Sequence, residues 1–351
     1  SKSALNAIVA KLAAKDSTLW GKDAEAEASI RLNWIDLPIS SRELLPDLDA
    51  LTAWARSKEI NEIVLAGMGG SSLAPEVISK SFGKQLTVLD TTDPDQIKAA
   101  IPSDLSRSLV VVGSKSGSTI ETASHKAFFT QLFKDSGLNP ADHFVIVTDP
   151  DSPLDKSARA DGLRVINADP HVGGRYSALS AFGLVPAALI GVDVSILLDD
   201  AASASATFTL DNSVATEIAA ILFDKGEQNV AFSDADSSTP GISDWIEQLI
   251  AESTGKSQTG RLPIALESSD SAISGTALRI EFSQSANADL VVEGSLGEQF
   301  ILWEWVTALL GYLLKVDPFN QPNVTEAKER TGALLSTWND GKVPHFAPTF
   351  E

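Results

Sequence analysis

Residues 62–72 read EIVLAGMGGSS, a short apolar segment that runs directly into a turn of glycine and serine. The same order of features returns at residues 109–119, which read LVVVGSKSGST. Each stretch is followed by a segment whose apolar residues have helical spacing, over 73–82 and over 120–133. Continuous apolar strands that alternate with helices predict a parallel sheet whose two faces are both covered by helices.

Further apolar segments extend this pattern along the chain. Additional strands are expected at 86–90, 144–148, 229–232, 263–266, 278–282 and 290–292. Additional helical segments are expected at 3–14, 41–57, 177–190 and 296–338. The predicted fold class is therefore α/β, with two parallel sheets flanked by helices and a helical C-terminal segment.

The pattern of strands and helices also predicts a division of the chain into regions. A boundary is expected near residues 191–194, after the helical segment that ends at 190. The expected regions are an N-terminal helical extension (1–40), a first α/β domain with both loops (41–192), a second α/β domain (193–330), and the end of the C-terminal helix with a polar tail (331–351).

The composition excludes several classes of function. The chain has 351 residues and a net charge of −20, from 47 acidic and 27 basic residues, so neither nucleic acid nor an anionic membrane is an expected partner. No apolar run reaches the ~20 residues that span a bilayer, and the first residues lack the apolar core of a signal peptide, so a cytoplasmic protein is expected. Because there is no cysteine and the four histidines are scattered, no metal centre is expected.

An anionic small substrate would need its few cationic contacts at one place on such an acidic chain. A Gly/Ser/Thr-rich loop between a strand and a helix can provide this place, because backbone N–H groups, hydroxyls and the helix dipole all favour an anion. Residues 69–72 and 114–119 have this character, and Lys115 adds a positive charge. Neither loop has the spacing of a Walker or dinucleotide-binding motif, and either one alone is more typical of a tight turn with a helix cap.

Five motifs that follow one another from about residue 60 to residue 330 form a more specific pattern. They read GGSSLAP at 69–75, SKSGSTIET at 114–122, GGRYS at 173–177, QLIAESTGK at 248–256 and FNQPNVTEAK at 319–328. In this order, the motifs resemble the glucose-6-phosphate isomerase family. The segments 173–190 and 296–328 are most similar to the isomerase part of transaldolase/glucose-6-phosphate isomerase fusion proteins.

The resemblance implies two sugar-isomerase (SIS) domains and the reversible isomerisation of glucose 6-phosphate and fructose 6-phosphate, a step of glycolysis and gluconeogenesis, without cofactor or metal. The implied partner is a small-molecule sugar phosphate, while a homodimer and a covalent fusion to a transaldolase domain in the native polypeptide are left open. The implied site residues are Ser71, Ser114, Lys115, Ser116 and Thr119 for the substrate phosphate, Gly70, Gln248 and Gln299 for the rest of the substrate, and Glu252, Arg175 and Lys328 for catalysis.

These residue types suit the implied reaction. Aldose–ketose interconversion needs a carboxylate that removes the proton from C2 and returns it at C1 through a cis-enediolate, which is the role implied for Glu252. A fixed cation near the developing oxyanion lowers the barrier, which suits Arg175 after its two glycines. Gln248 lies one helical turn before Glu252 and so on the same helix face, and Lys328 is implied at the sugar ring. Taken alone, a glutamate at position 252 is more typical of a solvated or capping carboxylate.

The sequence departs from the family pattern at a few positions. Ser116 and Gly117 stand where the family more often has Thr and Phe. More importantly, Gln299 stands where the family has the histidine that opens the pyranose ring, often across a dimer interface, and an amide is no general acid or base near neutral pH. Ring opening could use Lys328 with another group, the enzyme could take spontaneously opened sugar, or the chain could be impaired; His171 and, more weakly, His345 are candidate substitutes.

Two other functions are compatible with parts of this pattern. An isomerase of another phosphosugar, such as mannose 6-phosphate, would keep Glu252 and Arg175 and change its specificity. A non-catalytic sugar-phosphate-binding module would keep both loops but would not require Glu252, Arg175 and Lys328 together. The joint presence of these three residues favours an enzyme.

Overall fold

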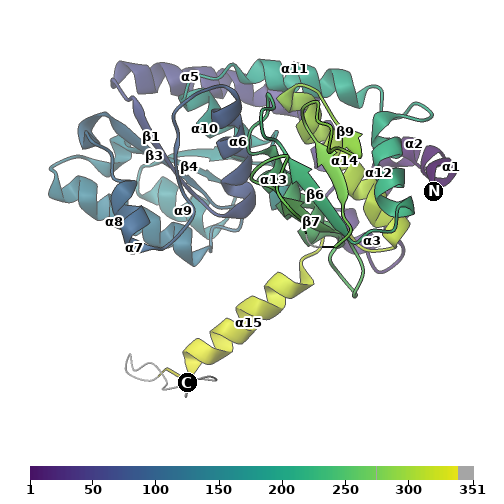
Figure 1. The fold of residues 1–351 in the computed structure, drawn as a ribbon. Coiled ribbons are helices and arrows are strands. Elements are labelled where there is room, and N and C mark those ends of the chain that lie inside the picture. Colours follow the sequence, from purple (N-terminus) through teal and green to yellow (C-terminus); the bar gives the residue numbers. More distant parts are fainter. Residues whose placement is uncertain (274, 339–351) are drawn as a thin grey trace, which may run out of the picture.

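Two parallel β-sheets form the framework of the protein, for which a computed structural model describes residues 1–273 and 275–338 (Figure 1). The strand order is β2-β1-β3-β4-β5 in the first sheet and β7-β6-β8-β9 in the second, and all paired strands are parallel. The strands are β1 (Glu62–Gly67), β2 (Thr87–Leu89), β3 (Ser108–Gly113), β4 (Phe144–Thr148), β5 (Arg164–Asn167), β6 (Asn229–Ser233), β7 (Leu262–Ala265), β8 (Leu278–Glu281) and β9 (Leu290–Val291). The predicted α/β class with two helix-flanked parallel sheets is confirmed.

Helices cover the sheets and connect the strands. They are α1 (Lys2–Asn6), α2 (Val9–Ala13), α3 (Glu25–Ala28), α4 (Leu37–Ser40), α5 (Leu45–Ser57), α6 (Leu73–Ser81), α7 (Pro94–Ala99), α8 (Ile120–Asp135), α9 (Pro153–Ala160), α10 (Ala181–Leu189), α11 (Val194–Ser205), α12 (Val214–Asp224), α13 (Ile242–Thr254), α14 (Leu296–Leu314) and α15 (Pro322–Ser336). Two short 3-10 turns, η4 (Gly69–Ser71) and η7 (Gly174–Tyr176), lie next to each other and belong to the site described below.

The side chains of β3 alternate between two hydrophobic cores, one on each face of the first sheet. Val110 and Val112 pack in the core that contains Phe129 of α8, whereas Leu109 and Val111 belong to the larger core that contains α10. Successive side chains of a strand point to opposite faces, and every residue of β3 is buried, so both faces must be covered. This double burial explains why the strand is a continuous apolar run.

The strands β1 and β3 are neighbours that end at the same level. Gly67 of β1 pairs with Gly113 of β3, the last residue of each strand. The loops that follow therefore start side by side at the carboxyl edge of the sheet, which is the edge where parallel α/β sheets bind ligands.

Two predicted helices differ from the structure. The helix expected over 177–190 begins only at Ala181, because Ser180 caps it and accepts a hydrogen bond from the backbone N–H of Phe182 (3.2 Å). The helix expected over 3–14 is divided into the two short helices α1 and α2.

The helical segment expected over 296–338 is also interrupted. Lys315 adopts a left-handed conformation (φ 57°) and ends α14. The Asp317 carboxylate then accepts hydrogen bonds from the backbone N–H groups of Phe319 (2.8 Å) and Asn320 (3.3 Å), which forms a turn before α15 begins. Periodicity alone did not reveal this turn, because apolar residues continue on both sides of it.

The two C-terminal helices have opposite environments. α14 is buried along most of its length and packs against α11, α12 and α13, whereas α15 projects from the body of the chain and contains no buried residue (Figure 1). The polar tail expected at the end of the chain, 339–351, lies outside the described residues. Within those residues, no helix combines the length and the apolar character that a bilayer span requires.

Candidate active site

A cavity of about 790 Å³ lies at the carboxyl edge of the first sheet. It is bordered by the loops after β1 and β3, the turn η7, one face of α13, the turn after α14 and the first turns of α15. The predicted site residues that line it are Gly70, Ser71, Ser114, Lys115, Ser116, Thr119, Arg175, Gln248, Glu252 and Lys328. Residues from five separate stretches of sequence therefore meet at one place.

The loop after β1 is interlocked with the loop that carries Arg175. A Cβ atom on Gly70 would lie 2.1 Å from the carbonyl oxygen of Gly174, so only glycine allows the two backbones to come this close. Gly69 has a positive φ of 55°, and a Cβ there would lie 2.6 Å from Nε2 of Gln248. The glycines of this motif thus let the loop approach both η7 and α13.

The loop after β3 is held by internal hydrogen bonds. The Ser114 hydroxyl lies 3.1 Å from the Thr119 hydroxyl, and the Thr148 hydroxyl donates to the Ser114 carbonyl at 2.6 Å. Gly117 has a φ of 66°, and a Cβ there would lie 2.8 Å from the backbone nitrogen of Leu154. The structure therefore gives a physical reason for a glycine at this departure from the family pattern. The loop leads into α8, whose N-terminus offers free backbone N–H groups.

Lys115 is the cation of this loop. Its Nζ donates to Oδ2 of Asp149 (2.6 Å) and to the carbonyl oxygen of Pro170 (3.2 Å). Partial burial lowers the pKa of Lys115, and the ion pair with Asp149 opposes this shift. The charge of Lys115 is thus held at the cavity wall and is shared with a carboxylate.

Arg175 is buried, with only 2% of its surface exposed, and its guanidinium is fixed by several acceptors. Its Nε donates to the Ser253 hydroxyl (2.8 Å), and its Nη2 donates to the carbonyl oxygens of Pro318 (2.6 Å) and Asn320 (3.1 Å). Its Nη1 lies 3.5 Å from Oε2 of Glu252. These contacts orient the planar cation before any ligand arrives.

Glu252 and Gln248 lie one helical turn apart on α13. Apolar side chains at the intervening positions, such as Leu249 and Ile250, are buried in the core, so the polar pair faces the cavity. Nε2 of Gln248 donates to Oε1 of Glu252 at 2.9 Å. One carboxylate oxygen is therefore held by an amide and the other lies near Arg175, while about a third of the side chain (32%) remains exposed.

Two predicted or candidate residues of the described part of the chain, Gln299 and His171, do not line this cavity. Gln299 is buried in α14, where its Nε2 donates to the Val292 carbonyl (3.0 Å) and its Oε1 accepts from Nε1 of Trp303 (3.0 Å). His171 is exposed and does not line the cavity, and His345 lies outside the described residues. A substrate contact by Gln299 stays a prediction.

The cavity also contains residues to which no role was assigned from the sequence. Glu27 and Arg31 come from the N-terminal extension, and Asp149 follows β4. Asp149 could have been found, because it directly follows a strand of the same sheet, but Glu27 and Arg31 carry no local motif. Lys256 lies in a recognised motif and donates to the carbonyl oxygens of Asp317 and Asn320 behind Arg175.

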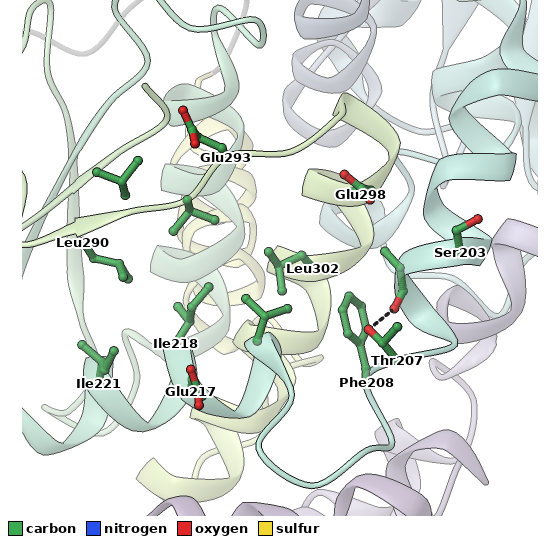
Figure 2. A pocket seen from close by; sticks show the side chains of 14 residues that line it. Ser203, Thr207, Phe208, Glu217, Ile218, Ile221, Leu290, Glu293, Glu298 and Leu302 are labelled. Carbon is green, nitrogen blue, oxygen red and sulfur yellow. Dashed lines mark hydrogen bonds between the residues drawn. The ribbon is translucent and has the colours of Figure 1, made fainter. Parts of the chain in front are cut away.

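A second cavity, of about 490 Å³, lies between α11, α12, α14 and β9 (Figure 2). Its walls are formed mainly by apolar side chains such as Phe208, Ile218 and Leu302, and the charged residues that line it are acids, among them Glu217 and Glu293. Such a surface repels an anion and lacks the serine-rich loops of the first cavity. Of these two cavities, the first is therefore the candidate site for an anionic ligand.

The first cavity can support proton transfer next to an oxyanion. It places a partly exposed carboxylate beside a fixed guanidinium and sets both next to hydroxyl-rich loops suited to phosphate. Among the described residues, no cluster of three or more histidine, aspartate or glutamate side chains is arranged to hold a metal ion.

Comparisons with known proteins point to one family. A family model described as phosphoglucose isomerase matches residues 50–259. A glucose-6-phosphate isomerase from Thermus thermophilus is 36% identical over 191 residues, which cover 52% of this chain and 44% of that protein. One from Campylobacter jejuni is 33% identical over 234 residues, which cover 62% of this chain and 57% of that protein. The chain spans about half the length of the curated relatives that it matches.

Solved structures share the fold. A hypothetical protein from Thermus thermophilus superposes with a TM-score of 0.79 at 24% identity, over 95% of each chain. A glucose-6-phosphate isomerase from Chlamydia trachomatis gives a TM-score of 0.74 at 22% identity, over 86% of this chain and 75% of that one. At these identities, the likeness establishes the two-sheet architecture alone.

Proposed function

The chain belongs to the phosphoglucose isomerase family, and from this premise we propose that it interconverts glucose 6-phosphate and fructose 6-phosphate through a cis-enediolate. The observation that carries the proposal is the meeting of Glu252, Arg175 and Gln248 beside the serine-rich loops after β1 and β3. Family membership alone would leave the chemistry of this chain open, since the match covers part of the relatives' length.

Glu252 acts as the base in the proposed reaction. Its carboxylate takes the proton from C2 of the open-chain aldose, the C–H electron pair forms the C1=C2 double bond, and the C1 carbonyl oxygen becomes the oxyanion of the enediolate. The proton of the C2 hydroxyl then passes to the neighbouring C1 oxygen of the cis-enediolate, the same carboxyl group returns its proton to C1, and the C2 oxygen becomes the ketone. The hydrogen bond from Gln248 (2.9 Å) holds the carboxylate in one rotamer, which keeps its other lone pairs directed at the cavity.

Arg175 stabilises the oxyanion in this scheme. Because its Nε and Nη2 are occupied by acceptors of the protein, only Nη1 faces Glu252 and the cavity. A cation whose position is fixed in advance requires no reorganisation when charge develops on the substrate, and this is the usual source of electrostatic catalysis.

The substrate phosphate is assigned to the loops after β1 and β3. Ser71, Ser114, Ser116 and Thr119 provide hydroxyls, Lys115 provides a charge, and the backbone at Gly70 and at the start of α8 provides N–H groups. This end of the cavity and the Glu252–Arg175 pair would then bind opposite ends of a linear sugar phosphate.

Ring opening has no histidine available among the described residues that line the cavity. Lys328 lines the cavity from α15 and is the residue we assign to the sugar ring. Ring opening is then assisted by Lys328 with a second group, or the open-chain sugar is taken from solution. Comparing turnover of freshly dissolved cyclic sugar with that of the equilibrated mixture distinguishes the two routes.

The proposal also includes the domain boundaries, the oligomeric state and the cellular location of the protein. We assign the two α/β domains to 41–192 and 193–330, which hold one sheet each, with the extension 1–40 before them and the region 331–351 after them. A homodimer, a transaldolase fusion and a cytoplasmic location are the corresponding expectations for the whole protein. Light scattering of the purified chain, the mass of the native polypeptide and cell fractionation test them in turn.

The proposal is tested by turnover and binding with two substrates. Purified chain should convert fructose 6-phosphate to glucose 6-phosphate, measured through a coupled dehydrogenase. Faster conversion of mannose 6-phosphate would instead identify an isomerase of that sugar. Binding of fructose 6-phosphate without any turnover would overturn the enzyme and favour a sugar-phosphate-binding module.

A further inference from the structure

The carbonyl oxygen of Pro170 accepts hydrogen bonds from two cations. Nη1 of Arg31 donates to it at 3.1 Å, and Nζ of Lys115 donates to it at 3.2 Å. Both side chains line the same cavity. Arg31, which lies more than eighty residues before Lys115 in the sequence, is thereby held next to the cation of the loop after β3.

Arg31 is built into this position by the N-terminal extension. Its Nε donates to Oε1 of Glu27, four residues earlier in α3, at 2.7 Å. The neighbouring Leu32 forms an antiparallel bridge with Val172, which ties the extension to the loop that contains Pro170. The side chain is 26% exposed. Arg31 therefore faces the cavity with a defined geometry.

The guanidinium of Arg31 keeps donors for a ligand. Its Nε and one Nη1 hydrogen are occupied by Glu27 and Pro170, while Nη2 donates to no group in the described part of the chain. A guanidinium presents its N–H groups in a planar fork that matches two oxygens of a phosphate. The unused edge of the fork is thus chemically suited to a phosphate group.

The charges at this end of the cavity favour a second cation as a contact for a bound phosphate dianion. Lys115, the cation of the loop, is paired with Asp149 at 2.6 Å. A phosphate monoester carries a charge of about −1.5 to −2 at pH 7, and the whole chain carries −20. Because Lys115 is paired with Asp149 and Arg31 is paired with Glu27 (2.7 Å), neither cation alone offsets this charge, so binding of a dianion calls for both of them together.

We propose that Arg31 is a second cationic contact for the phosphate of the substrate, contributed by the N-terminal extension next to Lys115. The assignment rests on the proposed phosphate site in the loop after β3 and adds to it a residue that selects phosphorylated over unphosphorylated sugars. The competing role is structural, in which Arg31 only fastens the extension to the loop at Pro170.

The test is the binding of inorganic phosphate to the whole chain, measured by isothermal titration calorimetry and so independent of turnover. Arg31→Gln should weaken the binding of inorganic phosphate roughly tenfold or more, the usual effect of removing a charge-assisted contact. Arg31→Lys keeps the charge but loses the planar fork of N–H groups. Its affinity for inorganic phosphate should therefore lie between that of Arg31→Gln and that of the wild type. Arg42→Gln is the matched control, because it removes the same charge from a surface ion pair with Asp199 outside the cavity.

Turnover and thermal unfolding separate the outcomes. If Arg31 binds phosphate, Arg31→Gln also raises KM for fructose 6-phosphate more than it lowers kcat. Unchanged phosphate affinity in Arg31→Gln, with or without a lower Tm, overturns the proposal even if the chain is an active isomerase. If Arg31→Gln weakens phosphate binding but the wild type shows no isomerase activity, the phosphate contact by Arg31 is supported and the proposed isomerase reaction is refuted. Absence of saturable phosphate binding by the wild type would overturn both assignments.

Discussion

Nη1 of Arg175 lies 3.5 Å from Oε2 of Glu252, while the other nitrogens of the same guanidinium are bound by the protein. The separation is longer than that of a tight ion pair, so the carboxylate is oriented by the cation without being occupied by it. A buried, fixed cation beside a partly exposed carboxylate is the arrangement expected for proton transfer next to a developing oxyanion. The roles of both residues can therefore be tested by substitution.

Arg175→Lys should lower kcat strongly while the chain stays folded. Lysine keeps the charge but lacks the planar guanidinium that donates hydrogen bonds to Ser253, Pro318 and Asn320. The position of the cation is therefore no longer fixed. Removing one preorganised electrostatic contact costs roughly 10²–10³-fold in kcat, and we expect a fall in this range with a smaller change in KM. Steady-state kinetics with circular dichroism as a folding control measures it. A fall in kcat of less than threefold would contradict the role of Arg175.

Gly70→Ala should destabilise the chain and disrupt the cavity. The added methyl group would lie 2.1 Å from the carbonyl oxygen of Gly174, so one of the two loops must move. The matched control is Gly174→Ala on the opposite side of the same contact, where an added Cβ meets nothing within 4 Å. We expect a lower Tm for Gly70→Ala than for Gly174→Ala in thermal unfolding. Equal Tm values would show that the two loops are not interlocked.

Glu304→Met should stabilise the chain, and more at high pH than at low pH. Glu304 is fully buried in α14 and its carboxylate has no hydrogen-bond partner in the described structure, so desolvation raises its pKa well above the usual value. A group with a raised pKa contributes its stability below the unfolded pKa and loses it as the pH rises through the folded pKa. The wild type should therefore lose stability above about pH 5, while the methionine variant loses less.

The measurement for Glu304 is urea unfolding of both chains at pH 5 and pH 8. Glu298→Ala is a suitable control for the helix, because it removes the side-chain acceptor that completes the capping box of α14 and should lower stability at both pH values. A methionine variant that is less stable than the wild type at pH 8 would show that the carboxyl group has a partner that the structure does not contain.

Lys256 should give the stability of the chain a pH dependence in the alkaline range. Burial, followed by the nearby charge of Arg175, lowers the pKa of Lys256 to about 7, while Asp317, Glu252 and Glu27 oppose the shift. Between pH 7 and the unfolded pKa of about 10.4, the unfolded chain binds the proton that the folded chain has released, so stability rises with pH in this window.

Lys256→Met should remove this contribution. Urea unfolding at pH 6.5 and pH 9 should then show a smaller difference between the two free energies of unfolding than in the wild type. Lys134→Met, at an exposed position of α8, is the control and should leave the difference unchanged. An identical pH difference in the wild type and Lys256→Met would contradict the lowered pKa.

The central strands of the first sheet were predictable because they are buried on both faces, whereas the strand β5, whose residues are only half-buried, was not predicted. β3 and β4 are continuous apolar runs, and this requirement of a covered parallel sheet is visible in the sequence without any other information. The glycines and serines after β1 and β3 likewise reflect a local need, since the backbones at Gly70 and Gly117 leave no room for a side chain. Features that a short segment requires for its own burial or backbone conformation can therefore be recognised in the sequence of that segment.

The parts that the sequence did not reveal have two kinds of cause, the first local and the others distant. The break between α14 and α15 is made locally by Lys315, whose left-handed conformation ends α14, and by Asp317, which accepts from two backbone N–H groups, and neither disturbs the apolar spacing on either side. Arg31 reaches the cavity only because the extension pairs with the loop at Val172. The position of Gln299 also follows from packing and not from its motif, since its amide bonds the Val292 carbonyl and the Trp303 indole.

The most direct test of the account is the conversion of fructose 6-phosphate to glucose 6-phosphate by the wild type and by Glu252→Gln. Glu247→Gln is the matched control, since it makes the same change at an exposed position of the same helix outside the cavity. Removing a general base costs roughly 10²–10⁴-fold. We predict that Glu252→Gln loses kcat in this range while Glu247→Gln retains the activity of the wild type. Equal turnover by the wild type and Glu252→Gln would contradict the assignment of Glu252 as the base.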